Sequence, residues 1–365
     1  AYFEDPDSCK AALHDLEMFH QEIVKTLFNG AHGPVAKRVK NLCAQCDTFL
    51  ANNRSPHRAF VYDQVVSFGE LLSTSIICAY LNHVGIAAEW VDARSCIKTD
   101  NFYRSAHLNW EQTQSAIQDQ IQGNVLKVTQ GFIASDMNNF TTTLGREGSD
   151  YTAAIFAYCL GATDVTIWKD VQGVLNADPR VFDKTQLLEH ISYQEAIELA
   201  FYGASVIHPK TLQPLQRKEI PLYVKSFLNP KQKGTKVGKG VPMQPEIPCY
   251  IVKKGLSLLR LSTRDFSFVV EDNISDIFKL LHEHKMSVDV IQNSAISFSV
   301  CVEDTYHKMD ALLLALRSRF DVKHTPDVSL YTIRHFEENS ANTLLSTHDL
   351  VLEQRTATTL QLVLK

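Results

Sequence analysis

The sequence lacks several features that mark common functional classes. It has no basic run and no aromatic stripe between basic residues, and its 36 Lys and Arg are outnumbered by 41 Asp and Glu, for a net charge of -5. Nucleic-acid binding needs clustered positive charge, so no nucleic-acid partner is expected. No apolar stretch approaches the roughly 18 residues of a membrane span, and no charged-then-apolar leader opens the chain. We therefore expect a cytoplasmic protein without membrane contact.

The cysteines do not form the dense pattern of a disulfide framework. Eight are spread over 365 residues, which is typical of small core side chains in a reducing compartment. Cys43 and Cys46 have Cys-x-x-Cys spacing, which also occurs in metal and redox sites. Because no second pair or His doublet completes a tetrahedral site, and the flanks look helical, we favour a core role and expect no protein metal site.

What the chain does have is enough apolar material for more than one domain. Hydrophobic residues make up 45% of its 365 residues, and a chain of this length commonly forms two or more domains. Up to about residue 228, helical patterns alternate with buried strands, as at the predicted strands 87–91, 125–133 and 165–168. This alternation favours an α/β fold with a mostly parallel central sheet.

The segment 141–154 carries the most functional information. It reads Thr-Thr-Thr-Leu-Gly-Arg-Glu-Gly-Ser-Asp-Tyr-Thr-Ala-Ala, and it lies between an apolar strand pattern and an apolar helical pattern. Gly145 and Gly148 flank Arg146, so the backbone can approach an anion while the guanidinium binds a carboxylate or phosphate. The simpler alternative is a glycine turn followed by a helix capped by Ser149 or Asp150.

This segment resembles the Thr-Thr-Leu-Gly-Arg-Gly-Gly-Ser-Asp signature of the aspartokinases, within the amino-acid kinase superfamily. Glu147 stands where that family usually has a second glycine. Further matches follow in the family's order, at residues 67–74, 168–175, 178–180 and 202–209. Several motifs in one order are far more specific than any one of them, and the resemblance covers nearly the whole chain.

The resemblance implies a phosphotransferase with a carboxyl group as acceptor. An aspartate kinase uses MgATP to phosphorylate the side chain of L-aspartate, giving 4-phospho-L-aspartate in lysine, threonine and methionine biosynthesis. Two alternatives stay open: a sister kinase acting on another acid such as glutamate, and a catalytically silent amino-acid-binding subunit. The second is motivated by the absence of a Lys-Phe-Gly-Gly-Thr-type strand, so we expect that the sequence begins after that strand.

The resemblance also assigns the substrate-binding residues. Arg146 would pair with the substrate α-carboxylate and Glu70 with its ammonium group; alone, Glu70 would be read as a solvated helix residue, but its place in Ser-Phe-Gly-Glu puts it in a motif. Asp150 is expected to orient the lysine of the strand that this sequence lacks. The remaining residues would shape the pocket: Phe132, Thr143, Glu147, Gly148 and Ser149.

The nucleotide-binding residues are expected in the later motifs. Backbone groups near Lys169, Asp170 and Leu175 would contact adenine and ribose, and Arg180 the phosphates, although Asp178-Pro179-Arg180 is also an ordinary turn sequence. Ser205, followed by Val206, stands where several aspartokinases carry a phosphate-directed lysine. For His208, which precedes Pro209, we favour a structural role at a helix start over acid–base chemistry.

The C-terminal part has a different pattern. After a Gly-, Pro- and Lys-rich segment at 229–248, which we interpret as a linker, the predicted order βαββα resembles an ACT domain, a ferredoxin-like ligand-sensing module. We expect a first unit at 249–326 and a second, interleaved unit with a weakly apolar helix at 327–365. A generic α+β sandwich is the alternative. The resemblance implies a homodimer, with lysine or threonine bound between ACT units near Asp272 or Asp289.

Overall fold

The computed structural model describes residues 2–3, 5–29, 33–204, 206–240, 242–265 and 267–365. The chain forms two compact units. The first comprises residues 1–167 and 207–222, and the second comprises residues 168–206 and 223–365. Each unit is therefore assembled from two separate stretches of the chain.

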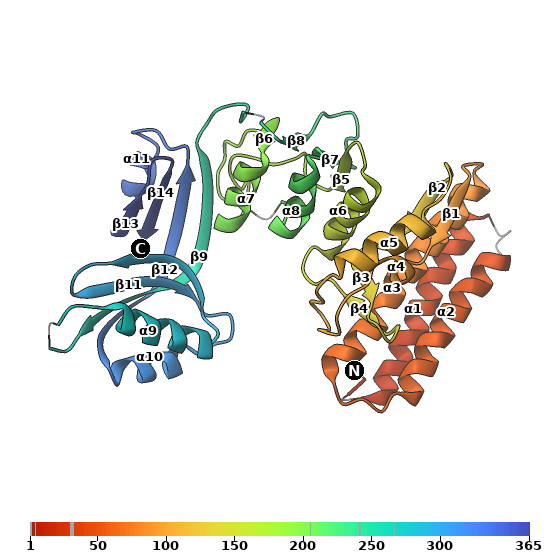
Figure 1. Ribbon diagram of the computed structural model, residues 1–365, viewed down its shortest axis with the longest axis horizontal. Helices are drawn as coiled ribbons and strands as arrows, with labels where there is room; N and C mark the ends of the chain where they lie inside the picture. Colours follow the sequence, from red (N-terminus) through yellow and green to blue (C-terminus); the bar gives the residue numbers. More distant parts are fainter. Residues whose placement is uncertain (1, 4, 30–32, 205, 241, 266) are drawn as a thin grey trace. The chain divides into compact units, whose positions relative to one another are not determined.

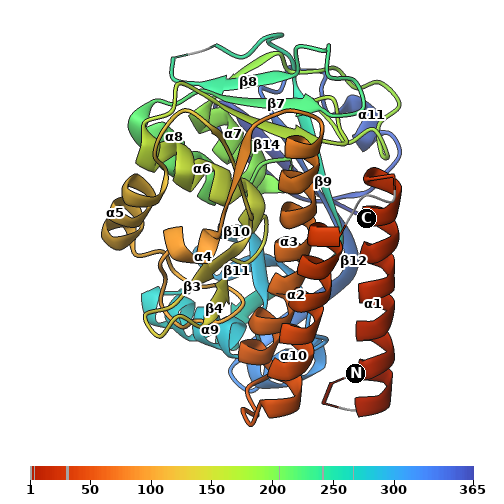
Figure 2. The same ribbon diagram turned by 90° about the vertical axis from the view of Figure 1, so that its right-hand side faces the viewer.

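Three long helices build one side of the first unit: α1 (Pro6–Leu27), α2 (Gly33–Asn52) and α3 (Arg58–His83). They run side by side (Figures 1 and 2). Apolar side chains spaced three or four residues apart form their common core, which includes Val24, Val39, Cys43 and Leu72. Seven of the eight cysteines are buried, and burial raises the pKa of Cys46 to about 12. The predicted core role of the cysteines is confirmed.

Helix α3 corrects the expectation that no apolar stretch is long enough to cross a membrane. By length and composition alone, its 26 residues would suffice. However, Asp63 and Gln64 lie buried in this helix, and both are hydrogen-bonded to other segments of the first unit. An internal helix of a folded domain has this combination of apolar surface and satisfied polar groups.

Short strands and helices complete the first unit. The predicted strand at 125–133 is wrong in its extent, because the left-handed φ of +70° at Phe132 interrupts it. The pair β1–β2 is parallel and the pair β3–β4 is antiparallel. The elements are β1 (Ala88–Val91), α4 (Ala93–Cys96), α5 (Trp110–Gln120), β2 (Leu126–Thr129), β3 (Ile133–Ser135), β4 (Thr141–Thr143), α6 (Gly148–Leu160) and α8 (Pro209–Lys218).

A four-stranded sheet has the order β5-β7-β8-β6, and its strands β5 and β7 begin in the first unit. Its strands are β5 (Val165–Lys169), β6 (His190–Ser192), β7 (Leu222–Ser226) and β8 (Thr235–Gly238), with α7 (Tyr193–Tyr202) following β6. Strand β8 lies inside the segment predicted as a linker. That prediction was wrong in this part, because Thr235 is fully buried and accepts a hydrogen bond from Val174 N at 2.8 Å.

The C-terminal sheet has six strands in the order β10-β11-β9-β12-β14-β13. Helices α9 and α10 cover one face of one half of it (Figure 1). The other half of the sheet carries the four-residue helix α11. The elements are β9 (Cys249–Thr263), α9 (Glu271–Glu283), β10 (Ser287–Asn293), β11 (Ser297–Glu303), α10 (Met309–Arg317), β12 (Phe320–Arg334), α11 (Asn342–Leu345), β13 (Leu350–Arg355) and β14 (Thr359–Leu364).

The two halves of this sheet share their central strands. Residues 258–263 of β9 pair with 320–325 of β12 in one half, and 249–253 pair with 330–334 in the other. Between them lies a register shift, with left-handed φ angles at Gly255 and Asp327. From the sequence pattern alone, a closing strand at 321–323 and a first strand of the second unit at 328–336 are expected as separate elements. The shift lets them continue as one 15-residue strand, which interleaves the two halves.

A buried ion pair fastens helix α7 to the end of β12. Arg334 donates from Nε and Nη2 to both carboxylate oxygens of Glu195, at 3.2 and 2.7 Å, and from Nη1 to Thr359 at 2.8 Å. His335 Nε2 lies 2.9 Å from Glu195 Oε2. Burial would raise the pKa of Glu195, but the bonds from Arg334 and His335 outweigh it and hold the pKa below its usual value.

Candidate active site

The turn that presents Arg146 is built on left-handed backbone. Gly145 has φ +79°, and Glu147 has φ +52° and occupies the N-cap position of α6. The helix starts at Gly148, so Ser149 and Asp150 lie in its first turn and are not the predicted caps. Arg146 is exposed, and no carboxylate among the described residues forms an ion pair with it. Its guanidinium is therefore available to an anion.

The start of α6 packs tightly against the loop between β2 and β3. A Cβ added at Gly131 would lie 2.7 Å from Ser149 Cβ, and one added at Gly148 would lie 2.8 Å from Phe132 Cδ2. Only glycine permits backbones to approach this closely. The structure thus brings together Phe132, Gly148 and Ser149, three of the predicted substrate-binding residues.

Thr143 takes part in a buried hydrogen-bond cluster that sequence reasoning missed. Its backbone N donates to Asp63 Oδ2 at 2.9 Å and its hydroxyl to Asp63 Oδ1 at 3.0 Å. Asp63 is fully buried on α3, and burial raises its pKa despite these bonds. The hydroxyl of Thr143 is thus engaged within the protein. Thr143 would therefore shape a substrate pocket through its place in β4 and not through a hydrogen bond from its hydroxyl to the substrate.

Glu70 lies on α3 seven residues after Asp63, two helical turns further along the same face. It is half-buried, and among the described residues no cation forms an ion pair with its carboxylate. Burial raises the pKa of this carboxyl group. An incoming ammonium group would relieve the cost of the buried negative charge.

Glu147 differs from the glycine expected at its position in two measurable ways. It holds a left-handed conformation that glycine adopts more easily, and its Oε2 is buried without a hydrogen-bond partner. The negative charge of Glu147 also acts on the pKa of His208. Burial and the nearby cations Lys210 and Arg146 lower the pKa of His208, and Glu147 partly opposes them.

The predicted structural role of His208 is confirmed. It caps α8, where its Nδ1 accepts a hydrogen bond from Lys210 N at 3.1 Å, and Pro209 follows as the first helical residue. The accepting Nδ1 carries no proton in the neutral ring. The proton of neutral His208 therefore resides on Nε2.

Most residues predicted to bind nucleotide lie in the second unit. Lys169 ends β5, and its carbonyl accepts a hydrogen bond from Phe227 N at 3.0 Å. Asp170 is exposed, Leu175 forms an isolated bridge with Leu187, and Val206 is half-buried. Arg180 is paired with Asp178 at 2.7 Å and lowers the pKa of that carboxyl. Ser205 lies outside the described residues.

A basic cavity of about 350 Å³ in the second unit was not anticipated from the sequence. Tyr223, Gly234 and three lysines contribute to its lining, together with Glu189 and His190; the lysines are Lys225, Lys233 and Lys236. The φ of +72° at Gly234 lets the chain turn back close to Val224 O, where a Cβ would collide. The cavity combines three ammonium groups with a glycine turn, which suits a phosphate-bearing ligand.

A smaller cavity of about 140 Å³ lies between the end of α7 and the C-terminal sheet, beside Tyr202, Lys253, Ser287 and Asp289. Asp289 was predicted to meet the ammonium group of an effector. Its side chain is only 6% exposed; one oxygen pairs with Lys253, and the other has no hydrogen-bond partner. A ligand ammonium at Asp289 would therefore compete with Lys253.

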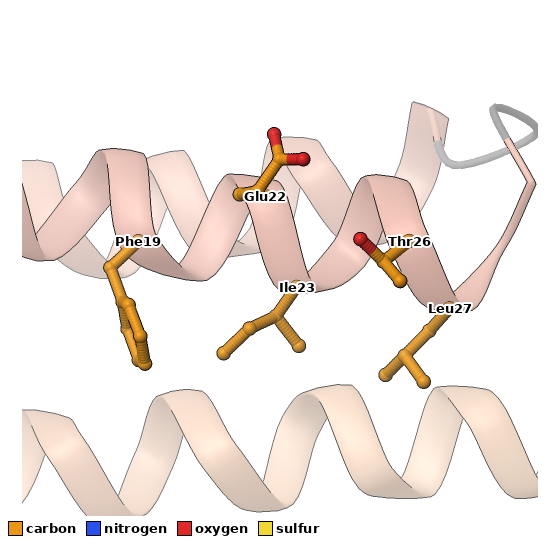
Figure 3. Close-up of a pocket in the computed structure, with 5 residues that line it drawn as sticks. All are labelled: Phe19, Glu22, Ile23, Thr26 and Leu27. Atoms are coloured by element: carbon orange, nitrogen blue, oxygen red, sulfur yellow. The ribbon is translucent and has the colours of Figure 1, made fainter.

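A third cavity, of about 260 Å³, lies along α1 and contains none of the predicted site residues. Phe19, Ile23 and Leu27 point from α1 to one side, whereas Glu22 points away (Figure 3). Its lining is mostly apolar, with Thr26 and with Glu22, which pairs with Lys25 at 3.7 Å. Across the described ranges, no cluster of three His, Cys, Asp or Glu side chains is arranged to hold a metal ion.

Comparison with known proteins places this geometry in a family. Residues 3–226 match the Amino acid kinase family. The chain is 35% identical over 246 residues to lysine-sensitive aspartokinase 3 of Escherichia coli, covering 67% of this chain and 55% of that protein. It is 36% identical over 251 residues to chloroplastic aspartokinase 1 of Arabidopsis thaliana, covering 66% and 43%. It thus spans about half the length of these curated relatives.

Solved structures agree in fold. The E. coli aspartokinase III structure with lysine and aspartate superimposes with a TM-score of 0.79 at 26% identity, covering 98% of this chain and 84% of that one. The structure of the same enzyme with aspartate and ADP gives 0.78 at 25% identity, covering 99% and 84%. The resemblance to aspartokinases and the predicted fold class are confirmed, with α/β kinase elements followed by an antiparallel C-terminal sheet. The chain belongs to the amino acid kinase family.

Proposed function

We propose that this chain is an aspartate kinase that transfers the γ-phosphoryl group of ATP to the side-chain carboxylate of L-aspartate. The observation that carries the proposal is a pair of uncompensated charges in the first unit. Arg146 is exposed without a counter-anion, and Glu70 is half-buried without a counter-cation. An amino acid supplies both missing charges, since its α-carboxylate would bind Arg146 and its ammonium group Glu70.

The remaining substrate-side residues would shape the pocket around these two charges. Phe132, Gly148 and Ser149 are in mutual contact, and Thr143 is held by Asp63. Asp150 lies in the first turn of α6, where it would orient a lysine that contacts the phosphates. The E. coli structures that superimpose on this chain contain aspartate, which supports the choice of substrate.

ATP would bind in the second unit. Lys225, Lys233 and Lys236 line one cavity and would neutralise the phosphates, a role that sequence reasoning had given to Arg180. The segments around Lys169, Asp170, Leu175 and Val206 remain candidates for contacts to adenine and ribose. The E. coli enzyme has been solved with ADP, which supports nucleotide use.

The chemistry needs positioning and charge neutralisation more than proton transfer. The side-chain carboxylate of free aspartate has a pKa of about 3.9 and is already ionised near neutral pH. Mg²⁺ accompanies ATP in such reactions and typically keeps several waters while binding phosphates and one or two carboxylates. Arg146, by binding the α-carboxylate, would fix the orientation of the substrate whose side-chain carboxylate accepts the phosphoryl group.

Trapping of the acyl phosphate with hydroxylamine tests this function. The protein is incubated with MgATP and either L-aspartate or L-glutamate, and the hydroxamate is measured. We expect hydroxamate with aspartate and far less with glutamate. Product from glutamate alone would favour the sister-kinase alternative. Aspartate binding without product from either acid would favour the catalytically silent subunit.

We further propose regulation by an end-product amino acid, lysine or threonine, at the C-terminal sheet. The E. coli relative was solved with lysine, and Asp289 here has a buried oxygen without a partner beside a small cavity. Calorimetric titration with each amino acid, on the wild-type chain and on Asp289→Asn, tests this. Equal binding by both proteins would remove Asp289 from the effector site. The homodimer and the cytoplasmic location stay predictions.

A further inference from the structure

Arg104 holds a conformation that its side chain does not favour. Its φ is +72°, in the left-handed region where a non-glycine residue is strained. Its backbone N–H points at both carboxylate oxygens of Asp63, at 2.9 and 3.1 Å. Its carbonyl oxygen would lie 3.2 Å from a Cβ added at Gly145. The backbone of Arg104 thus lies between the buried carboxylate of Asp63 and Gly145, the glycine that precedes Arg146.

The buried carboxylate of Asp63 joins three segments of the first unit by hydrogen bonds. It sits on α3, accepts from Arg104 in the loop 100–107, and accepts from the backbone and the hydroxyl of Thr143 in β4. Ala106 N also donates to Thr143 O at 2.9 Å, which lays the loop along β4. A fully buried carboxylate is costly unless hydrogen bonds compensate it, and here they fix one loop beside the Arg146 turn.

The hydrogen bonds from Arg104 to Asp63 come from its backbone N–H, and the charge of its guanidinium only moderates the raised pKa of Asp63. The guanidinium lies 4.7 Å above the ring of Tyr62, is exposed, and forms no ion pair with any described residue. An aromatic ring attracts a cation but does not neutralise its charge. Two cations without counter-anions, Arg104 and Arg146, therefore lie on adjoining backbone segments. Glycine would fit the backbone at position 104 better than arginine.

We propose that Arg104 is a second substrate-binding cation, which receives the side-chain carboxylate of a dicarboxylic amino acid, and that Asp63 is the positioning residue that holds it there. This inference rests on the proposed function and deepens it. Arg146 binds the α-carboxylate, which all amino acids share. Arg104 selects the second carboxylate, the one that accepts the phosphoryl group.

Calorimetric titration with L-aspartate and L-asparagine separates the two arginines, because asparagine has the same α groups but no side-chain charge. The wild-type chain should bind aspartate about 10- to 100-fold tighter than asparagine, the range of one charge-assisted hydrogen-bonded contact. Arg104→Gly should bring this ratio near one while leaving asparagine affinity and the thermal unfolding midpoint close to unchanged. Arg104→Lys should keep part of the preference. Arg54→Ala, which removes an exposed arginine before α3, is the matched control and should keep the full ratio.

Asp63 is tested through Arg104. Asp63→Asn should lower the same ratio, and the double variant Asp63→Asn with Arg104→Gly should have the same ratio as Arg104→Gly alone, since Asp63 acts through that residue. An unchanged ratio in a stably folded Arg104→Gly protein, with aspartate still preferred by the wild type, would overturn this inference alone. A wild-type chain that binds neither amino acid would overturn the proposed function together with it.

Discussion

Arg146 and Arg334 show how differently two arginines are placed in one chain. Arg334 is 8% exposed and bonded to Glu195 and Thr359, and His335 Nε2 lies 2.9 Å from the same carboxylate. Arg146 is exposed on a turn of left-handed backbone and has no ion pair with the described residues. A guanidinium whose donors are satisfied inside the protein cross-links elements. One that lacks partners on a constrained turn is available to a ligand.

The largest effect is expected from breaking the satisfied arginine. Arg334→Ala leaves the carboxylate of Glu195 buried without its guanidinium partner, and the loss of one member of a buried pair costs about 3–5 kcal/mol of unfolding free energy. Denaturant unfolding measures it. The double variant Arg334→Met with Glu195→Leu is the control, because removing both charges should restore much of the stability. A single variant as stable as wild type would contradict the cross-linking role.

The same pair predicts a pH dependence. Because the folded protein holds the pKa of Glu195 below its usual value, the stabilisation is present above the unfolded pKa of about 4.5 and disappears as the pH falls through the folded pKa. The stability difference between wild type and Arg334→Ala should therefore shrink in acid. A difference that stays constant from pH 7 to pH 3 would show that Glu195 is not the charged partner.

A smaller and opposite effect is expected beside Arg146. Glu147→Gly should stabilise the protein by about 0.5–1 kcal/mol, since glycine accommodates φ +52° and the change removes a buried oxygen without a partner. Glu147→Gln retains the left-handed strain and should not stabilise to the same degree. Thermal unfolding of both variants checks this. Destabilisation by Glu147→Gly would mean that its carboxylate has a partner.

The smallest effect concerns His208. Burial and nearby cations lower its pKa and Glu147 opposes them, so Glu147→Gly should lower the pKa further. Titration of its ring protons by NMR in both proteins measures the difference. Because the folded state disfavours the protonated ring, the contribution of His208 to stability should be lost as the pH falls below its unfolded pKa. A pKa that rises in the variant would contradict this electrostatic account.

The sequence predicted what local patterns determine. Its patterns indicate a helix at 193–202 and a strand at 222–226, which are the bounds of α7 and β7, and the glycine-flanked Arg146 was recognisable from its motif. Asp63 was not recognised, because a carboxylate within a helix usually faces solvent. Its partners Arg104 and Thr143 lie 41 and 80 residues away. The basic cavity was not predicted, because a segment rich in Gly, Pro and Lys is typical of a linker. Only the structure shows that β8 forms within this segment and joins a sheet.

The most direct test of the comparison measures two quantities on Arg146→Ala: the affinity for L-aspartate by calorimetry and the free energy of unfolding. A guanidinium that serves only the ligand should give a loss of about 2–5 kcal/mol in aspartate recognition, with stability within about 0.5 kcal/mol of wild type and ATP affinity little changed. Unchanged aspartate affinity, or a loss of stability like that expected for Arg334→Ala, would contradict the assignment of Arg146 to the substrate.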